Sequence, residues 1–180
     1  SSDLRIGVVT GHIPLSKVSS EITSDKIIDK IIQMKDSIVE DFGIENPKIA
    51  VLGLNPHAGD HGLLGKEDIE ILEPAILSVN REKEIAFGPF AADGFFGSRN
   101  YLQYDGVLAM YHDQGLVPFK ALAFESGVNY TAGLPIVRTS PAHGVAYDIA
   151  GQGVADICSF ISALKLGCMV YEKRKSMLAE

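Results

Sequence analysis

The run Gly106-Val-Leu-Ala-Met-Tyr111 is the stretch of this 180-residue chain that says most about its fold. It is short and apolar, and it has the length and composition of a buried strand. Two further runs of this kind, Arg5–Thr10 and Lys48–Leu54, lie among Gly and Pro residues. Helical patterns separate and follow these runs. The alternation predicts an α/β fold in which helices cover the faces of a mostly parallel sheet.

A histidine follows each of these three predicted strands. His112 comes directly after Tyr111, and His12 and His57 follow the other two runs within a few residues. We expect the three imidazoles at the carboxyl edge of the sheet, where α/β proteins bind ligands. A lone histidine near a strand end is more often structural, but three at equivalent ends favour one shared divalent metal ion.

Helical periodicity is clearest over Ser24–Phe42, where Ser24 is the expected N-cap and Gly43 the expected C′ residue. A second helical pattern runs from Lys66 to Val79 and should kink or break into two pieces at Pro74. The remaining predicted helices cover residues 114–123, 144–151 and 155–172, the last apolar and buried. The remaining predicted extended segments cover residues 84–87, 128–131 and 134–138, the first ended by Gly88-Pro89.

The composition is that of a globular chain large enough for one domain, with 46% hydrophobic and 22% charged residues. A net charge of −7 argues against general binding of nucleic acid or of an anionic membrane surface. No apolar run reaches the roughly 18 residues of a membrane span. Cys158 and Cys168 fall on different faces of one predicted helix, which excludes a disulfide between them and suits a reducing cytoplasm.

Lys120, Asn129 and Arg138 form a second group of candidate site residues. Arg binds phosphate or carboxylate through two parallel hydrogen bonds, and Lys acts as a compact point charge. Arg138 ends an apolar segment, so it is either paired with a structural carboxylate or aimed at an anionic ligand. Close to a metal ion in an acidic protein, these residues favour a small anionic substrate.

The segment Ser140–Gly153 is a glycine-containing loop that leads into a predicted helix. Such a joint offers backbone N–H donors to an anion or a nucleotide. The chain contains neither G-x-G-x-x-G nor a Walker A sequence, which excludes an ordinary Rossmann site and a P-loop.

Five segments of the chain resemble the 4-hydroxythreonine-4-phosphate dehydrogenase family of pyridoxal phosphate biosynthesis. The resemblance extends in order over nearly the whole chain, and Asn-Pro-His-Ala-Gly and Tyr-His-Asp-Gln-Gly are its most specific sequences. The segments are Gly11–Leu15, Leu54–Gly59, Gly88–Asp93, Leu108–Gly115 and Gly127–Thr139. The resemblance implies an isocitrate/isopropylmalate dehydrogenase-like α/β/α fold. Residues 1–180 would form its C-terminal portion, with the N-terminal part of the fold absent.

The same resemblance implies a metal site and a partner. His12, His57 and His112 match the family's metal ligands, and imidazole ligation favours zinc, with cobalt, manganese or magnesium as other options. The family's active site is shared across a homodimer, so His112 is expected to come from the second subunit.

The resemblance also assigns the anionic substrate and the cofactor NAD. The residues that match those holding the phosphorylated substrate are Lys120, Asn129 and Arg138, and Lys120 is also a candidate catalytic base. The residues that match those holding the adenosine half of NAD are His143, Gly144 and Asp148. A carboxylate at Asp148 suits ribose hydroxyls and so NAD over NADP.

The implied activity is NAD-dependent oxidation and decarboxylation of 4-phosphooxy-threonine to 3-amino-2-oxopropyl phosphate. A family segment that precedes the first histidine motif and contacts substrate is absent, so we expect the 180 residues alone not to turn over substrate. One alternative is a paralogous dehydrogenase for 4-phospho-D-threonate or 4-phospho-erythronate. Another is a catalytically silent metal-binding or dimerisation fragment, although structural zinc sites usually have four protein ligands.

Overall fold

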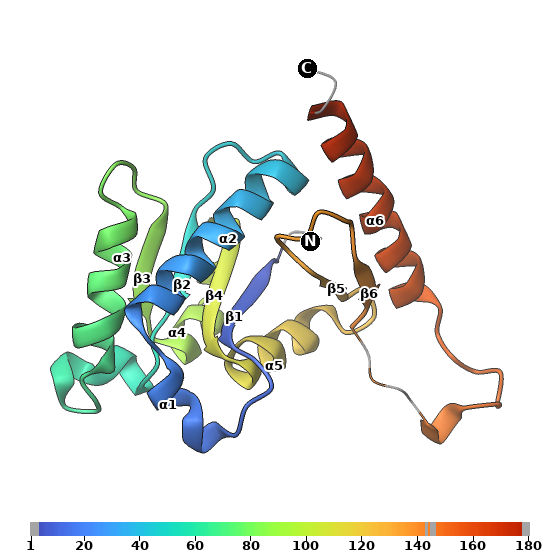
Figure 1. Cartoon of the computed structure of the whole chain (residues 1–180). Helices are drawn as coiled ribbons and strands as arrows, with labels where there is room; N and C mark the ends of the chain where they lie inside the picture. The colour runs from blue at the N-terminus through green and yellow to red at the C-terminus, as the bar shows by residue number, and fades with distance from the viewer. Residues whose placement is uncertain (1–3, 143, 145–146, 178–180) are drawn as a thin grey trace.

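The structure is a computed structural model that describes residues 4–142, 144 and 147–177. A four-stranded parallel sheet with the order β1-β4-β2-β3 organises the chain (Figure 1). Its strands are β1 (Ile6–Thr10), β4 (Gly106–Tyr111), β2 (Ile49–Leu52) and β3 (Ala86–Phe90). The predicted α/β fold with a parallel sheet is therefore confirmed.

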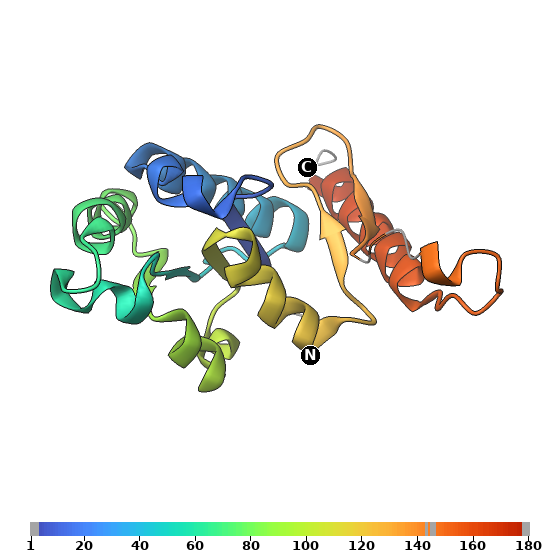
Figure 2. The same cartoon turned by 90° about the horizontal axis from the view of Figure 1, so that it is seen from below.

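Helices cover both faces of this sheet (Figure 2). α2 (Ser24–Phe42) and α3 (Glu73–Val79) pack on one face, and α4 (Ala92–Gly97) and α5 (His112–Ala123) lie on the other. The shorter helical segments are η1 (Leu15–Lys17), α1 (Val18–Glu21), η2 (Pro56–Gly62), η3 (Asp68–Leu72), η4 (Asn100–Gln103) and η5 (Tyr147–Ile149).

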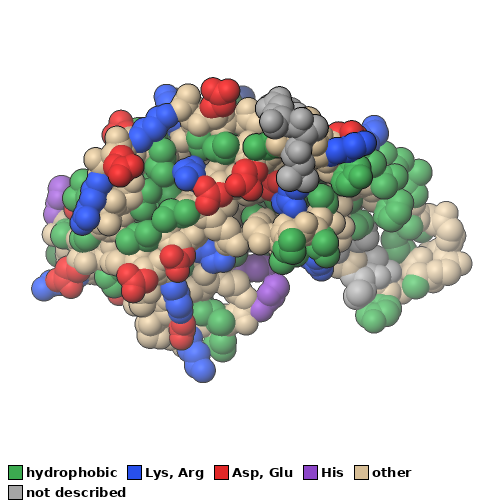
Figure 3. Space-filling view, turned by 45° about the horizontal axis from the view of Figure 1, so that its top comes forward, with side chains coloured by type: hydrophobic (Ala, Val, Ile, Leu, Met, Phe, Trp, Pro, Cys, Tyr) green, Lys and Arg blue, Asp and Glu red, His purple; other side chains and the backbone are tan. Residues whose placement is uncertain are grey.

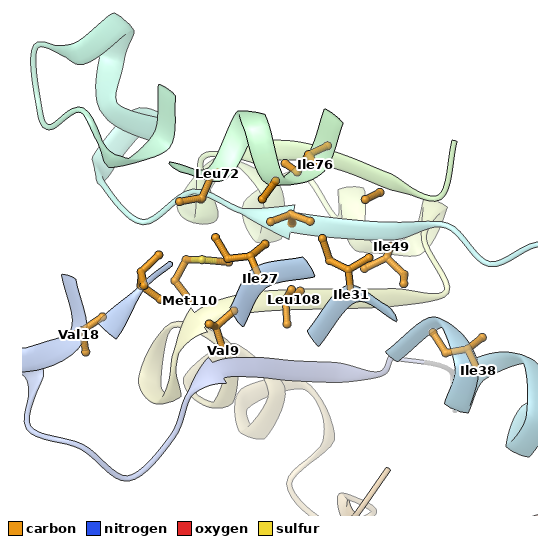
Figure 4. Close-up of a cluster of buried hydrophobic side chains, with 14 residues drawn as sticks. Val9, Val18, Ile27, Ile31, Ile38, Ile49, Leu72, Ile76, Leu108 and Met110 are labelled. Atoms are coloured by element: carbon orange, nitrogen blue, oxygen red, sulfur yellow. The ribbon is translucent and has the colours of Figure 1, made fainter. Parts of the chain in front are cut away.

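The larger hydrophobic cluster fills the space between the sheet and the helices α2 and α3 (Figure 4). Its labelled side chains are Val9, Val18, Ile27, Ile31, Ile38, Ile49, Leu72, Ile76, Leu108 and Met110. Alternate residues of β2 and β4 point to the opposite face and form a smaller cluster with Phe95. Because both faces of the central strands are buried, β2 and β4 are apolar without a polar alternation.

The boundaries of the first half follow the expected helix signals with one correction. The N-cap of α2 is Thr23 rather than Ser24, because the Thr23 hydroxyl accepts the backbone N–H of Lys26. Gly43 ends the helix with φ 72°, as predicted. Pro74 lies in the first turn of α3, directly after the π-helical turn η3, so the helix changes type before Pro74 but is not broken there.

Several expectations for residues 84–151 were wrong. Gly88-Pro89 does not end the strand as expected, because β3 continues through both residues. β3 is an edge strand, and there a proline can stand without the N–H that a central strand would need for pairing. Residues 134–138 form a loop, and the strand β6 (Thr139–Pro141) follows them and pairs antiparallel with β5 (Val128–Tyr130). Of the helix expected over residues 144–151, the described residues form only the short helical turn η5. The glycines of this segment disfavour a longer helix.

α6 (Cys158–Met177) forms as a helix, but it is not buried as predicted. Its buried residues are only Ser159, Ala163 and Val170, while Phe160 and Leu164 are 61% and 59% exposed. Apolar side chains accordingly gather on the surface at this end of the molecule (Figure 3). In the part of the chain that the structure describes, no helix combines the length and apolar character needed to cross a membrane.

A buried ion pair fastens α6 to α2. Asp41 of α2 accepts the Nε–H of Arg174 at 2.5 Å, and it also accepts the hydroxyls of Ser37 and Tyr130. Arg174 in turn donates to the carbonyl of Leu134 at 2.9 Å. Burial alone raises the pKa of Asp41, but the hydrogen bonds from Arg174, Tyr130 and Ser37 outweigh it and lower the pKa below its usual value. The cluster holds the β5–β6 hairpin and α6 against α2.

Asp41→Asn is expected to destabilise the protein by about 3 kcal/mol, since Arg174 then lies beside a neutral amide. The pKa of Asp41 is depressed in the folded state, so its stabilisation is present above the unfolded-state pKa of about 3.9 and is lost as pH falls below it. Denaturant unfolding at a series of pH values measures both effects. An equal stability difference between wild type and variant at pH 7 and pH 3 contradicts this assignment.

Candidate active site

The carboxyl ends of three neighbouring strands carry the predicted metal ligands. β4 pairs in parallel with β1 on one side and with β2 on the other. His12 follows β1 by two residues, His112 is the first residue of α5 after β4, and His57 lies in η2 beyond β2. The strand order therefore directs all three segments to one edge of the sheet.

The imidazole rings of His12 and His112 lie side by side at this edge. Their centroids are 5.4 Å apart and their planes are tilted by 48°. Two imidazoles that bind one tetrahedral ion through nitrogens at about 2 Å have ring centres roughly 5 Å apart. The Nδ1–H of His112 donates to the Asp113 carboxylate at 2.7 Å, which leaves Nε2 as its free nitrogen. The pair fits the geometry and donor chemistry of a zinc-type ion.

His57 does not complete this group within one chain. Among the described residues, no three His, Cys, Asp or Glu side chains gather closely enough to hold a metal ion. The structure thus brings together two of the three predicted ligands, and both belong to the same chain. The expectation that His112 comes from a second subunit stays a prediction, although His112 already lies beside His12 of its own chain.

The backbone around His57 is left-handed over five residues. The φ angles are 55° at His57, 51° at Ala58, 82° at Gly59, 42° at Asp60 and 54° at His61. A left-handed conformation costs an L-residue other than glycine about 1–2 kcal/mol. Four such residues within a run of five persist only where the surrounding contacts compensate the strain.

Gln114 ties together the ends of two of the strands. Its Oε1 accepts the N–H of Met110 in β4 at 2.7 Å, and its Nε2 donates to the carbonyl of Gly53, after β2, at 2.6 Å. Because Gln114 lies two residues after His112, it fixes the first turn of α5 to the segment that leads to His57. Sequence reasoning did not single out this residue, although its place directly after a predicted ligand was a usable signal.

The predicted substrate residues lie on two different elements. Lys120 is exposed on α5, about 12 Å along the helix axis from His112. Asn129 belongs to β5, and Arg138 directly precedes β6, so the β5–β6 hairpin carries both. Arg138 donates to the Thr131 hydroxyl at 2.8 Å and forms no ion pair within the described ranges. Its guanidinium is therefore available to an anion.

The predicted cofactor residues are placed only in part. His143 lies outside the described residues. Gly144 is exposed, and Asp148 is exposed in η5, where its backbone carbonyl accepts from Gln152 at 2.7 Å. The assignment of this segment to NAD stays a prediction.

Comparison with known sequences places the chain among its relatives. The profile of the family described as pyridoxal phosphate biosynthetic protein PdxA matches residues 1–167. The chain belongs to the PdxA family. A 4-hydroxythreonine-4-phosphate dehydrogenase of Bacteroides thetaiotaomicron is 55% identical over 174 residues, covering 97% of this chain and 48% of the relative. One from Prosthecochloris aestuarii is 52% identical, covering 92% of this chain and 48% of the relative.

Solved structures agree with this membership of the PdxA family. The crystal structure of the Klebsiella pneumoniae 4-hydroxythreonine-4-phosphate dehydrogenase has a TM-score of 0.79 at 38% identity, covering 97% of this chain and 52% of that chain. A terephthalate 1,2-cis-dihydrodiol dehydrogenase from Burkholderia xenovorans has a TM-score of 0.72 at 29% identity, covering 94% of this chain and 53% of that chain. The chain spans about half the length of the relatives that it matches.

Gln114→Leu is expected to lower the free energy of unfolding by about 2 kcal/mol, because the Met110 N–H and the Gly53 carbonyl lose their partner. Gln103→Leu is the matched control, since Gln103 is exposed and its side chain bonds only to nearby Asn100. Chemical denaturation of both variants measures the difference. Equal midpoints for the two variants would show that Gln114 is not a structural tie.

Proposed function

We propose that the complete protein is a metal-dependent, NAD-dependent dehydrogenase of pyridoxal phosphate biosynthesis. Its reaction is the oxidation and decarboxylation of 4-phosphooxy-L-threonine to 3-amino-2-oxopropyl phosphate. The observation that carries the proposal is the His12–His112 pair at the carboxyl edge of the sheet, in a chain of the PdxA family. Relatives such as the Bacteroides thetaiotaomicron protein are named 4-hydroxythreonine-4-phosphate dehydrogenase.

His12, His57 and His112 are the residues that would hold the metal ion. Three imidazoles favour zinc, with cobalt, manganese or magnesium as alternatives. A bound divalent ion supplies Lewis-acid stabilisation of negative charge on the substrate oxygens during oxidation and loss of carbon dioxide. The chain itself orients the donors, because Asp113 holds the ring of His112 through Nδ1 and leaves Nε2 available.

The cationic and amide side chains would bind the phosphorylated substrate. Arg138, held by Thr131 and free of a carboxylate partner among the described residues, suits bidentate capture of phosphate. Asn129 on the paired strand adds a neutral donor, and Lys120 is the candidate base that takes the hydroxyl proton. The NAD adenosine is assigned to the segment with His143, Gly144 and Asp148.

A second candidate function is dehydrogenation of 4-phospho-D-threonate or 4-phospho-erythronate. Lys120, Asn129 and Arg138 recognise a phosphorylated acid but do not by themselves read its amino group. The Burkholderia xenovorans structure, similar in fold, belongs to a protein named for a different dehydrogenase reaction. Assays of the complete protein are therefore needed to decide between these substrates.

The proposed assembly is a homodimer in the cytoplasm, with the active site shared between the subunits. The apolar side chains exposed on α6 are support for an interface, since monomeric surfaces rarely carry large apolar patches. Within the described residues Cys158 and Cys168 are free and exposed thiols, which suits a reducing compartment.

The complete protein is expected to form NADH from 4-phosphooxy-L-threonine, to lose this activity with a chelator and to regain it with Zn²⁺ or Co²⁺. His57→Ala should lower the rate by about 100-fold or more while the fold is retained. His61→Ala in the same turn is the matched control and should keep the activity. Circular dichroism reports the fold of each variant, and absorbance at the NADH band reports the rate.

Two results would contradict this proposal. They are NADH formation that is indifferent to chelator and unchanged activity in His57→Ala. Robust turnover by the 180 residues alone would instead contradict the expectation that they do not turn over substrate by themselves. A higher rate with 4-phospho-D-threonate or 4-phospho-erythronate favours the second candidate function.

A further inference from the structure

Asp68 is a fully buried carboxylate beside the turn that carries His57. Its exposed fraction is 0%, and it occupies the first turn of η3. In the described part of the chain, no Lys, Arg or His forms an ion pair with it. A buried charge without a counter-ion is costly unless hydrogen bonds satisfy its oxygens. The partners of this carboxylate therefore indicate what it does in the fold.

Within the described residues, the donors to Asp68 belong to the two residues that precede Pro56-His57, Leu54 and Asn55. Oδ1 accepts the backbone N–H of Leu54 at 2.7 Å. Oδ2 accepts the backbone N–H of Asn55 at 3.1 Å and its side-chain Nδ2 at 2.9 Å. Hydrogen bonds from N–H groups to an ionised carboxylate are stronger than neutral ones. Asp68 therefore fixes the exit of the chain from β2.

The backbone packs tightly around this carboxylate on both sides of the turn. A Cβ on Gly53 would lie 2.8 Å from Oδ1 of Asp68 and 2.9 Å from the Cα of Ala58. Gly59 has φ 82°, and a Cβ there would lie 3.3 Å from Oδ2 of Asp68. Side chains at these positions would push the turn away from its anchor.

A second carboxylate extends the same network toward the segment that follows His12. Asn55 Nδ2 also donates to Glu67 at 2.9 Å, and the hydroxyl of Ser19 in α1 donates to Glu67 at 2.8 Å. The N–H of Glu67 itself, Asn55 and Ser19 lower the pKa of Glu67. The segments after β1 and after β2 are thus joined through adjacent acidic residues.

We propose that Asp68 is a positioning residue that holds the strained left-handed turn in place and so presents His57 to a metal ion at the sheet edge. Without its carboxylate, the turn is free to relax toward right-handed backbone and His57 moves. The inference rests on the proposed function, because it assigns Asp68 to the metal site of that reaction.

The test is Co²⁺ binding by the complete protein and by its Asp68→Asn variant. Asn keeps the size of the side chain but turns one acceptor into a donor that faces the N–H of Leu54 or Asn55. Asp41→Asn is the matched control, because Asp41 is also a buried carboxylate but contacts α6 instead of η2. Titration gives the affinity, and the visible spectrum of bound Co²⁺ reports its ligand number and geometry.

Asp68→Asn is expected to weaken Co²⁺ binding by at least about 10-fold and to change the spectrum. Asp41→Asn should stay within about twofold of wild type despite its lower stability. Equal affinities of wild type and Asp68→Asn overturn the inference and leave the proposed function intact. An equal loss in Asp41→Asn also overturns it, since the effect is then one of general stability. A wild-type protein that does not bind Co²⁺ overturns the proposed function and the inference with it.

Asn55→Ala provides a second variant if Asp68→Asn does not fold. It removes the side-chain bonds to Asp68 and Glu67 while leaving both backbone donors in place. Co²⁺ binding should weaken severalfold. Wild-type affinity and an unchanged spectrum in this variant overturn the inference.

Discussion

The parallel pairing of β4 with β1 on one side and β2 on the other is the constraint on which the site depends. Both faces of β4 and β2 are buried under helices, which makes their register hard to change. Parallel pairing in turn sends the three following segments to one edge of the sheet. The proximity of His12 and His112, 100 residues apart in sequence, is thus a consequence of core packing.

Besides this rigid sheet edge, the site includes segments outside the sheet that are held in place by their own polar contacts. The turn with His57 is strained, and the residues that lead into it are held by hydrogen bonds: Leu54 and Asn55 donate to Asp68, and the Gly53 carbonyl accepts from Gln114. The hairpin with Asn129 and Arg138 lies outside the sheet and is held instead through Tyr130, Arg174 and Asp41. The proposed metal ligand His57 and the proposed anion-binding residues therefore depend on different polar clusters, and substitutions in each cluster can test them separately.

Much of the sheet was predictable because buried parallel strands leave a strong apolar signal, as Gly106–Tyr111 does. The cap at Thr23 was missed because Thr23 and Ser24 are both good capping residues and only the fold selects between them. α6 was predicted as buried because its apolar content was read without knowing what packs against it. Asp68 carried no local signal, since its partners lie 13 and 14 residues away and the left-handed turn they stabilise is a tertiary feature.

X-ray absorption spectroscopy of the zinc-loaded complete protein tests the central claim most directly, because it counts the ligands on the ion. The account predicts three imidazole nitrogens at about 2.0 Å, with the remaining coordination from oxygen. A spectrum dominated by sulfur at about 2.3 Å, or one with fewer than three imidazoles, would contradict it.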